Sequence, residues 1–194
     1  MIKISSKKEE YELFNKLSND WWNEDGKKNQ EGNYRSGQQH GTWINYNEKG
    51  RKIEESQWKN GELFGKTTLW DKNGNKTILK SFKEDEKDGL WIWWSPNGKK
   101  VKEGNFKLGD KNGKWTYYHA NGKKKRLENY KLGKKNGKPI VWFENGQKER
   151  EESYKNDEKH GKWTYWFENG RLDKEEKYTN GVQTDGKHYD YFDN

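Results

Sequence analysis

Aromatic and β-branched residues gather in short segments along the chain, and a turn sequence follows each segment. Every residue in the segment 163–167 is aromatic or β-branched, which is the composition that β-strands prefer. Successive side chains of a strand point to opposite faces, so each segment predicts a strand with two different faces. Asn-Gly pairs such as Asn97 and Gly98 are typical of type I′ turns, which need positive φ at both positions. The pattern therefore predicts β-hairpins.

The hairpin pattern recurs every 24 residues. Two glycine series keep this step: Gly41, Gly65, Gly89, Gly113, Gly137 and Gly161, and Gly26, Gly50, Gly74, Gly98, Gly122, Gly146 and Gly170. Between hairpins a third turn position carries glycine, or Asp85 and Asp157, and aspartate tolerates left-handed backbone. One hairpin buries too few rings to offset the entropy of ordering its residues. The hairpins must therefore stack, and we predict an all-β, elongated antiparallel sheet of stacked hairpins.

The start of the chain departs from the repeat. A capping-box pattern in residues 6–9 is followed by apolar residues at helical spacing between residues 11 and 17, as at the start of an amphipathic helix. We expect a short capping helix over residues 1–18. The repeat domain is then expected over residues 19–194, with about seven hairpins, the last one partial.

Composition changes this picture in two ways. Hydrophobic residues make up only 27% of the 194 residues, but 12 Trp and 11 Tyr are present, so aromatic rings must supply most of the buried surface. The absence of cysteine excludes disulfides and thiolate metal sites and fits a reducing compartment. Because the sequence also shows neither a membrane-spanning run nor a signal peptide, we expect a cytoplasmic protein.

The usual catalytic motifs are missing from the sequence. Neither a nucleophile elbow, a phosphate-binding loop nor a zinc-protease motif occurs. Glutamates such as Glu151 and Glu152 recur at neighbouring repeat positions; paired acids can perform acid and base chemistry, but flanking lysines favour cross-strand ion pairs. We therefore expect a non-enzymatic protein with neither a cofactor nor a metal site.

Basic residues are arranged in two columns. The formal net charge is +8 and the pI about 9.3, which favours anionic partners. The candidate anion-facing residues are Lys52, Lys76, Lys100, Lys124 and Lys148 in the first lysine column, and Lys59, Lys83, Lys107, Lys131 and Lys155 in the second lysine column. These lysines could face a polyanion, or they could keep an open sheet soluble and block strand addition.

The segment 161–170, G-K-W-T-Y-W-F-E-N-G, with Tyr178 eight positions later, resembles the bacterial variant of the MORN repeat. The resemblance extends over residues 19–192 and implies a curved, elongated sheet of stacked hairpins. Many bacterial members are YwqK-type antitoxins or immunity proteins, others are scaffolds, and eukaryotic relatives are associated with phospholipids. Thr67 and Pro139 replace the first-strand tryptophan in two repeats, so any binding surface built on these rings is expected to be uneven.

These observations predict a protein-binding module, most concretely an antitoxin or immunity protein that occludes a toxin with an acidic surface. Trp and Tyr dominate binding hot spots, and the candidate anchors are Trp43, Trp91, Trp93, Trp115, Tyr117, Trp163 and Tyr165. The alternative is a peripheral scaffold that binds anionic phospholipid or membrane through the lysine columns. A nucleic-acid binder is less favoured, because stacking on bases would need rings that the core requires.

Overall fold

The computed structural model describes residues 20–189 of the chain. The chain divides into two compact units, Met1–Asp88 (unit 1) and Gly89–Asn194 (unit 2). All regular elements among the described residues are strands, and no helix among them is long and apolar enough to cross a membrane. The capping helix expected over residues 1–18 lies outside the described residues.

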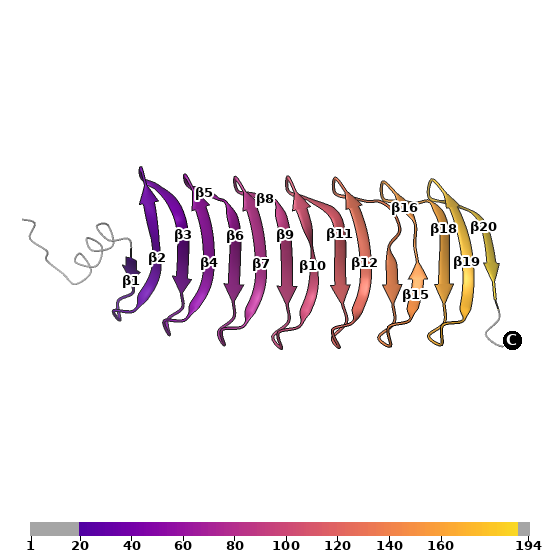
Figure 1. Cartoon of the computed structure of the whole chain (residues 1–194), viewed down its shortest axis with the longest axis horizontal. Coiled ribbons are helices and arrows are strands. Elements are labelled where there is room, and N and C mark those ends of the chain that lie inside the picture. Colours follow the sequence, from indigo (N-terminus) through magenta and orange to yellow (C-terminus); the bar gives the residue numbers. More distant parts are fainter. Residues whose placement is uncertain (1–19, 190–194) are drawn as a thin grey trace, which may run out of the picture. The chain divides into compact units, whose positions relative to one another are not determined.

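Unit 1 is an antiparallel sheet of hairpins (Figure 1). Its strands are β1 (Asp20–Trp22), β2 (Lys28–Arg35), β3 (Gln38–Tyr46), β4 (Lys52–Lys59), β5 (Glu62–Leu63), β6 (Gly65–Trp70), β7 (Lys76–Lys83) and β8 (Glu86–Lys87). Strands that follow one another along the chain pair with each other, except that β5 and β6 both pair with β4. The strands after the glycine turns begin at Lys28, Lys52 and Lys76, which confirms the period of 24 residues.

Unit 2 repeats the same hairpin. Its strands are β9 (Gly89–Trp94), β10 (Lys100–Lys107), β11 (Asp110–Tyr118), β12 (Lys124–Lys131), β13 (Lys134–Lys135), β14 (Ile140–Trp142), β15 (Lys148–Glu151), β16 (Tyr154–Lys155), β17 (Glu158–Lys159), β18 (Gly161–Trp166), β19 (Leu172–Thr179) and β20 (Val182–His188). The short strands β16 and β17 form a separate two-stranded ladder. The predicted all-β fold of stacked antiparallel hairpins is confirmed within each unit.

The Asn-Gly turns differ from their predicted type. In the turn after β9, Gly98 has φ +78° and donates its N–H to the Ser95 carbonyl at 2.8 Å, and the Ser95 N–H donates to the Lys99 carbonyl at 2.9 Å. Asn97 is not at positive φ. This is a type I turn followed by a glycine bulge, so the type I′ prediction at this position is wrong.

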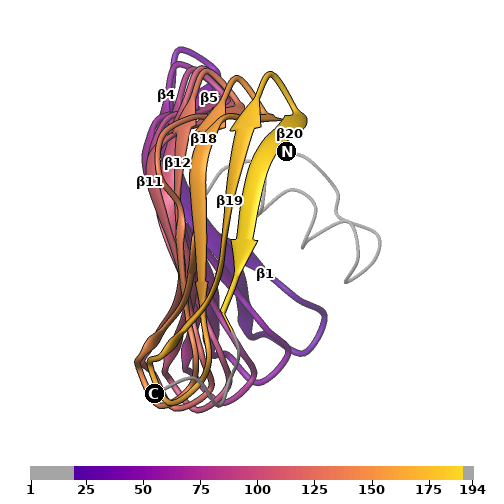
Figure 2. The ribbon, with the colours of Figure 1, turned by 90° about the vertical axis from the view of Figure 1, so that its right-hand side faces the viewer.

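Type I′ turns occur at the other ends of the strands, where one hairpin passes to the next (Figure 2). Leu108 and Gly109 have φ of +50° and +80°, and Asn156 and Asp157 have φ of +53° and +71°. Asp157 Oδ1 also accepts the Lys135 N–H at 2.7 Å. Asp85 Oδ1 accepts the Leu63 N–H at the same distance. Aspartate replaces glycine at these two turns with the gain of a hydrogen bond to the preceding hairpin.

Most of the buried residues lie on one side of the hairpins, which we call the aromatic face, whereas Ile92 and Thr164 are buried on the other side. Trp115 is 1% exposed, and its indole covers Gly104, where a Cβ would come within 2.2 Å of the ring. Gly104 is paired in register with both Trp91 and Trp115. A residue without a side chain is therefore needed between two tryptophans. In unit 1, Gly32 has the same relation to the Trp43 ring.

The tryptophan column is interrupted at Thr67 and Pro139. Pro139 occupies a tryptophan position and lacks the N–H that a ladder needs, and the pairing breaks between β13 and β14. Next to it, the Glu152 N–H donates to the Pro139 carbonyl at 2.9 Å. The side chains of Glu128 and Glu152 are buried there. An ionic cluster thus fills the space that rings fill elsewhere.

Candidate partner-binding row on the aromatic face

One line of side chains crosses the strands of unit 2 on the aromatic face. Each member is paired in register with the next one across the ladder, and directly paired residues project from the same face of a sheet. The members, in order, are Trp93, Lys102, Tyr117, Arg126, Val141, Arg150, Tyr165 and Lys174. We call this line the basic row, because every second position is a cation.

The cations of the basic row occur once per hairpin. Lys102, Arg126, Arg150 and Lys174 are each 24 residues apart. Neighbouring cations lie two strand spacings apart, so the distance along the row is about 9.6 Å, from about 4.8 Å between adjacent strands. The row therefore carries one cation per hairpin at a regular interval. Arg126, Arg150 and Lys174 are each paired with a carboxylate, whereas Lys102 forms no ion pair with any described residue.

The two lysines at the ends of the row lie over aromatic rings. The Nζ of Lys102 is 4.3 Å from the centre of the Trp93 ring, and the Nζ of Lys174 is 4.4 Å from the centre of the Tyr165 ring. A cation over a ring face is attracted by the ring quadrupole. These contacts hold the ammonium groups at the surface of the aromatic face, where both rings remain half-buried.

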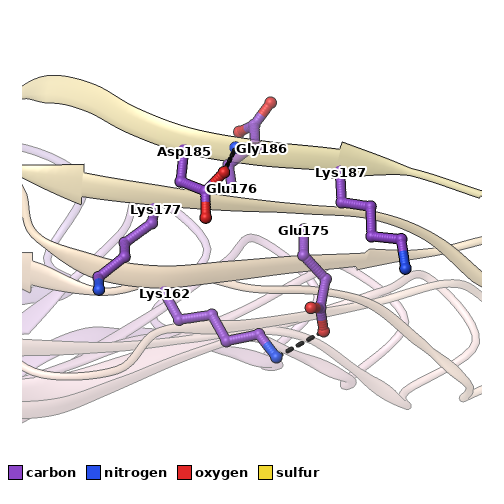
Figure 3. Close-up of a pocket in the computed structure, with 7 residues that line it drawn as sticks. All are labelled: Lys162, Glu175, Glu176, Lys177, Asp185, Gly186 and Lys187. Atoms are coloured by element: carbon purple, nitrogen blue, oxygen red, sulfur yellow. Dashed lines mark hydrogen bonds and ion pairs between the residues drawn. The ribbon is translucent and has the colours of Figure 1, made fainter.

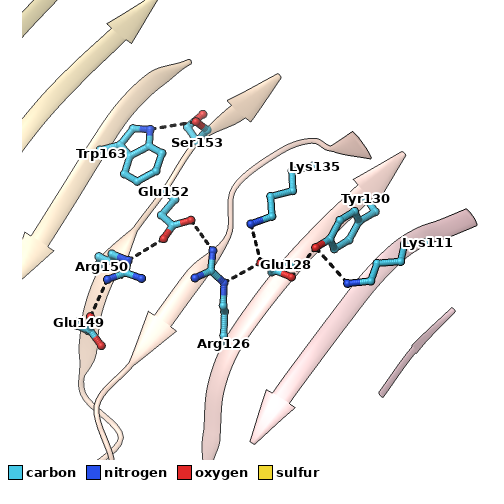
Figure 4. Close-up of polar contacts among 10 residues, drawn as sticks. All are labelled: Lys111, Arg126, Glu128, Tyr130, Lys135, Glu149, Arg150, Glu152, Ser153 and Trp163. Atoms are coloured by element: carbon cyan, nitrogen blue, oxygen red, sulfur yellow. Dashed lines mark hydrogen bonds and ion pairs between the residues drawn. The ribbon is translucent and has the colours of Figure 1, made fainter. Parts of the chain in front are cut away.

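The two arginines in the middle of the row share one buried carboxylate (Figure 4). Glu152 lies between Arg126 Nη2, at 2.9 Å, and Arg150 Nε, at 2.7 Å. Its side chain is 3% exposed, whereas that of Arg150 is 30% exposed. The carboxylate thus holds the guanidinium groups from beneath. Within the described residues, Arg126 Nη1 and Arg150 Nη2 meet no protein acceptor, so each arginine keeps donors for a ligand.

A second buried carboxylate, Glu128, completes the support. It lies 2.8 Å from Arg126 Nε and 3.1 Å from Lys135 Nζ, and it accepts a 2.7 Å hydrogen bond from the Tyr130 hydroxyl. Burial acts to raise the pKa of Glu128, but the hydrogen bonds from Tyr130 and Lys135 and the Arg126 charge outweigh it and lower that pKa below its ordinary value. Glu128 is therefore ionised at neutral pH and fixes Arg126.

The tyrosine between Lys102 and Arg126 stays neutral. Burial, together with the charge of Glu128, raises the pKa of Tyr117 to about 12. Its hydroxyl accepts a 3.1 Å hydrogen bond from Lys111 Nζ and is hydrogen-bonded to Glu128. The row therefore offers ammonium and guanidinium donors beside aromatic surface, and these donors suit carboxylate groups.

The structure separates the seven candidate anchors into two groups. Trp93, Tyr117 and Tyr165 lie in the basic row and are half-buried. The other four are buried in the core: Trp43, Trp91, Trp115 and Trp163. Neighbouring rings cover them, as Phe106 does at 5.1 Å from Trp91 and 5.0 Å from Trp115. These four tryptophans hold hairpins together and leave little ring surface for a partner.

The first lysine column lies next to the glycine turns, where glutamates neutralise part of it. Lys52 pairs with Glu55 at 2.6 Å and Lys100 with Glu103 at 2.7 Å, and Lys148 pairs with Glu151. In two hairpins, leucine occupies the glutamate position, and there Lys76 and Lys124 form no ion pair with any residue the structure describes. The column is thus not a uniform line of free charge.

The second lysine column lies at the far ends of the same strands. Its members Lys59, Lys83, Lys107 and Lys131 end the eight-residue strands that members of the first column begin. Seven residues at about 3.4 Å each place the two columns about 24 Å apart. All members of the second column are exposed, Lys155 included. The two columns are therefore two separate lines, and neither coincides with the basic row.

The cations of the basic row were not among the candidates from the sequence. Their column contains both lysine and arginine, and the earlier repeats carry Gln30, Glu54 and Ile78 there. A search for one residue type therefore misses it. The feature of the sequence that could have identified these residues is a positively charged residue at a constant spacing, and it is present in the last four repeats only.

A shallow groove of about 460 Å³ lies beside β19 and β20 (Figure 3). Its lining residues are Lys162, Glu175, Glu176, Lys177, Asp185, Gly186 and Lys187. Lys162 Nζ is 2.5 Å from Glu175 Oε1, and the lysines and acids of the lining are equal in number. The groove contains no member of the basic row and has no charge excess that would select an anion.

Four segments of the chain match a known repeat family described as MORN repeat variant. The matched residues are 87–108, 111–132, 135–156 and 159–180, so each matched segment carries one cation of the basic row. Repeats of this family generally act as binding modules. No curated protein shows significant sequence similarity to the chain.

Proposed function

We propose that the chain is a non-enzymatic binding module, acting in the cytoplasm, which holds a protein partner with an acidic surface on the basic row of unit 2. The observation that carries this function is the in-register alternation of four cations with Trp93, Tyr117, Val141 and Tyr165. Arginine, tryptophan and tyrosine are the residues that most often dominate protein interfaces.

The charge balance of the chain supports an acidic partner. With a net charge of +8, the chain attracts acidic proteins from a distance and speeds their encounter. At the row itself, Arg126 and Arg150 keep free donors while buried glutamates fix their position. Preorganised donors lose less side-chain entropy on binding than free ones do.

The identity of the partner as a toxin follows from the resemblance to YwqK-type antitoxins and immunity proteins. In this proposal the chain neutralises the toxin by covering its acidic surface. The test is growth of cells that express the captured partner alone or together with the chain. Rescue by the wild-type chain supports neutralisation, and a partner that never impairs growth contradicts it.

Affinity capture tests the binding module directly. The full chain, a row variant Lys102→Gln/Lys174→Gln, and a control variant Lys76→Gln/Lys124→Gln are used as baits in the same cell extract. The two variants lose equal charge. An acidic protein that is retained by the wild type and the control but lost by the row variant supports the proposal. Equal retention by all three baits contradicts it.

A second candidate function, peripheral binding to anionic lipid, is favoured by two exposed leucines. Leu108 and Leu132 are 68% and 66% exposed at the tips of neighbouring type I′ turns. Lys107 and Lys131 precede them. Apolar side chains flanked by lysines suit a membrane surface that carries anionic headgroups.

Vesicle sedimentation tests this second candidate. Vesicles that contain phosphatidylserine are mixed with the wild type and with Leu108→Asn/Leu132→Asn at low and high salt. Asparagine already occupies the same turn position at Asn60 and Asn156, so the variant keeps the turn. Binding by the wild type that is lost in the variant supports lipid binding, and no sedimentation of the wild type at low salt excludes it.

A further inference from the structure

We infer that the basic row binds an extended acidic segment of the partner, in polyproline II conformation, with a carboxylate at every third residue. The inference rests on the proposed function and specifies the chemistry of the partner. It follows from the spacing of the row, from the groups that lie between its cations, and from the way in which those cations are held.

The first argument is the match of two periods. The cations of the row recur about every 9.6 Å. A polyproline II helix rises about 3.1 Å per residue and has three residues per turn, so every third side chain projects from the same side about 9.3 Å further on. Over the three intervals between Lys102 and Lys174 the mismatch is then only about 0.9 Å.

Other peptide conformations fit the row less well. In an extended β-strand, side chains on one face are two residues apart, or about 6.8 Å, and residues three apart face opposite ways. In an α-helix, seven residues advance about 10.5 Å, and the mismatch grows to about 2.7 Å over three intervals. Of the three conformations, polyproline II therefore matches the spacing of the row most closely.

The second argument is the chemistry between the cations. Trp93, Tyr117 and Tyr165 alternate with the cations and remain half-buried on the aromatic face. Proline-rich polyproline II segments dock against aromatic side chains in many recognition domains. An acidic residue followed by two prolines would thus meet a cation and then a ring, Tyr117 or Tyr165, in two of the three intervals. In the interval between Arg126 and Arg150 the buried Val141 takes the place of the ring.

The third argument is that the cations are held in place. Glu152 orients both Arg126 and Arg150, Glu128 orients Arg126, and Glu176 lies 2.7 Å from Lys174 Nζ. Lys102 is held over Trp93. Charges that are held at a constant spacing favour a ligand whose charges have the same spacing. Little conformational entropy is then lost on binding, because both sets of charges are already ordered.

Fluorescence anisotropy with synthetic peptides tests the inference on the full chain. The probe is a labelled peptide of four Glu-Pro-Pro triplets. The matched control has the same composition, with its four glutamates in one block. We expect the periodic peptide to bind at least tenfold more tightly than the block peptide, and Lys102→Gln to weaken it at least threefold. Lys76→Gln/Lys124→Gln should change its affinity less than twofold.

The variant Arg126→Gln/Arg150→Gln extends the test to the centre of the row, with a thermal melt to show that it is folded. If it does not fold, Lys102→Gln still decides the outcome, because Lys102 has no carboxylate partner among the described residues. Equal affinity for the periodic and block peptides would overturn the inference. Tighter binding of a helical peptide with glutamate at every seventh position, or of single-stranded DNA, would overturn it as well.

The outcomes separate this inference from the proposed function. Capture of an acidic protein through the row, with no preference for the periodic peptide, leaves the function standing and removes the inference. Periodic binding that depends on Lys102, without any captured protein, supports the inference and contradicts the proposed function.

Discussion

The same cross-strand line exists in both units but carries different chemistry. In unit 1 its members, paired in register, are Trp21, Gln30, Asn45, Glu54, Leu69 and Ile78. Gln30 Nε2 donates to Asn45 Oδ1 at 2.7 Å, and Asn45 Nδ2 donates to Glu54 Oε2 at 3.0 Å. An amide, a carboxylate and an aliphatic side chain, those of Gln30, Glu54 and Ile78, thus stand in unit 1 where unit 2 has lysines and arginines.

This difference shows which positions the hairpin repeat leaves free. Both units keep a glycine against a tryptophan, as at Gly32 and Gly104, and both keep the two kinds of turn. The line across the strands varies without a change of fold. Sites grafted on a constant scaffold are where function differs between related structures, so the basic row of unit 2 is the better candidate for a binding site.

The largest expected effect comes from removal of the carboxylate that supports the row. Glu152→Ala leaves Arg126 and Arg150 without their shared buried partner and should lower the free energy of unfolding by about 3–5 kcal/mol. In unit 1 the same column holds Ser56, whose Oγ accepts a 2.8 Å hydrogen bond from Trp58 Nε1. Ser56→Ala should cost only about 1 kcal/mol.

Urea unfolding of both variants measures this contrast. Glu149→Ala serves as the control in unit 2, because Glu149 also contacts Arg150 but its side chain is 34% exposed. If Glu152→Ala lowers the free energy of unfolding no more than Ser56→Ala does, the ionic cluster is not a structural support of unit 2.

A smaller effect is expected where glycine separates two rings. Gly104→Ala places a methyl group where the Trp115 ring lies, at 2.2 Å, and the ring must move. We expect a loss of about 1–3 kcal/mol in the free energy of unfolding, measured by urea unfolding. Asn105→Ala on the same strand is the control, because it keeps the backbone carbonyl that accepts the hydrogen bond from Trp115 Nε1. Its free energy of unfolding should stay near that of the wild type, and an equal loss in both variants would refute the packing argument.

Acid should weaken unit 2 through Glu128. The pKa of this carboxyl is lower in the folded chain than its ordinary value of 4.5. Its ionised form therefore stabilises the fold fully above pH 4.5, and this contribution is lost as the pH falls through the folded pKa. Glu128→Gln should be less stable at pH 7 and should lose less stability on acidification. Urea unfolding at pH 7 and pH 3.5 checks this, and parallel losses in both proteins would contradict it.

The smallest effect is expected for the first lysine column. The side chain of Lys100 is 42% exposed in its pair with Glu103, and pairs of this kind contribute at most about 1 kcal/mol. Lys100→Gln should therefore change stability little, with a difference from wild type that shrinks in high salt. It should leave binding of the acidic peptide unchanged. A marked loss of peptide binding would move the binding site to this column.

The sequence predicted the fold through its strongest regularities. The constant spacing of the glycines and aromatic residues is sufficient to predict a stack of hairpins, because each hairpin buries its rings only against a neighbouring hairpin. Type I′ turns were predicted at the wrong ends of the strands, since Leu108 and Leu132, which have positive φ, are not residues that favour that conformation, whereas Asn97 is. The conformational propensities of single residues therefore predicted the type I′ turn at the wrong position.

The candidate site was only partly predictable. Trp93, Tyr117 and Tyr165 were identified by residue type, but buried tryptophans such as Trp115 have the same type and spacing. The alternation of side chains along one strand does not predict which rings will be covered by side chains of neighbouring strands. The pairing of Arg126 with Val141 and Arg150 depends on the cross-strand register, and in β-sheets register is a long-range property.

Carbodiimide cross-linking of the full chain to the Glu-Pro-Pro peptide tests the central claim most directly, since it joins carboxylates only to lysines in contact with them. Mass spectrometry should find the cross-links at Lys102 and Lys174, the two lysines of the basic row. Cross-links concentrated at Lys76 and Lys124, or at Lys107 and Lys131, would contradict the assignment of the binding site to the aromatic face of unit 2.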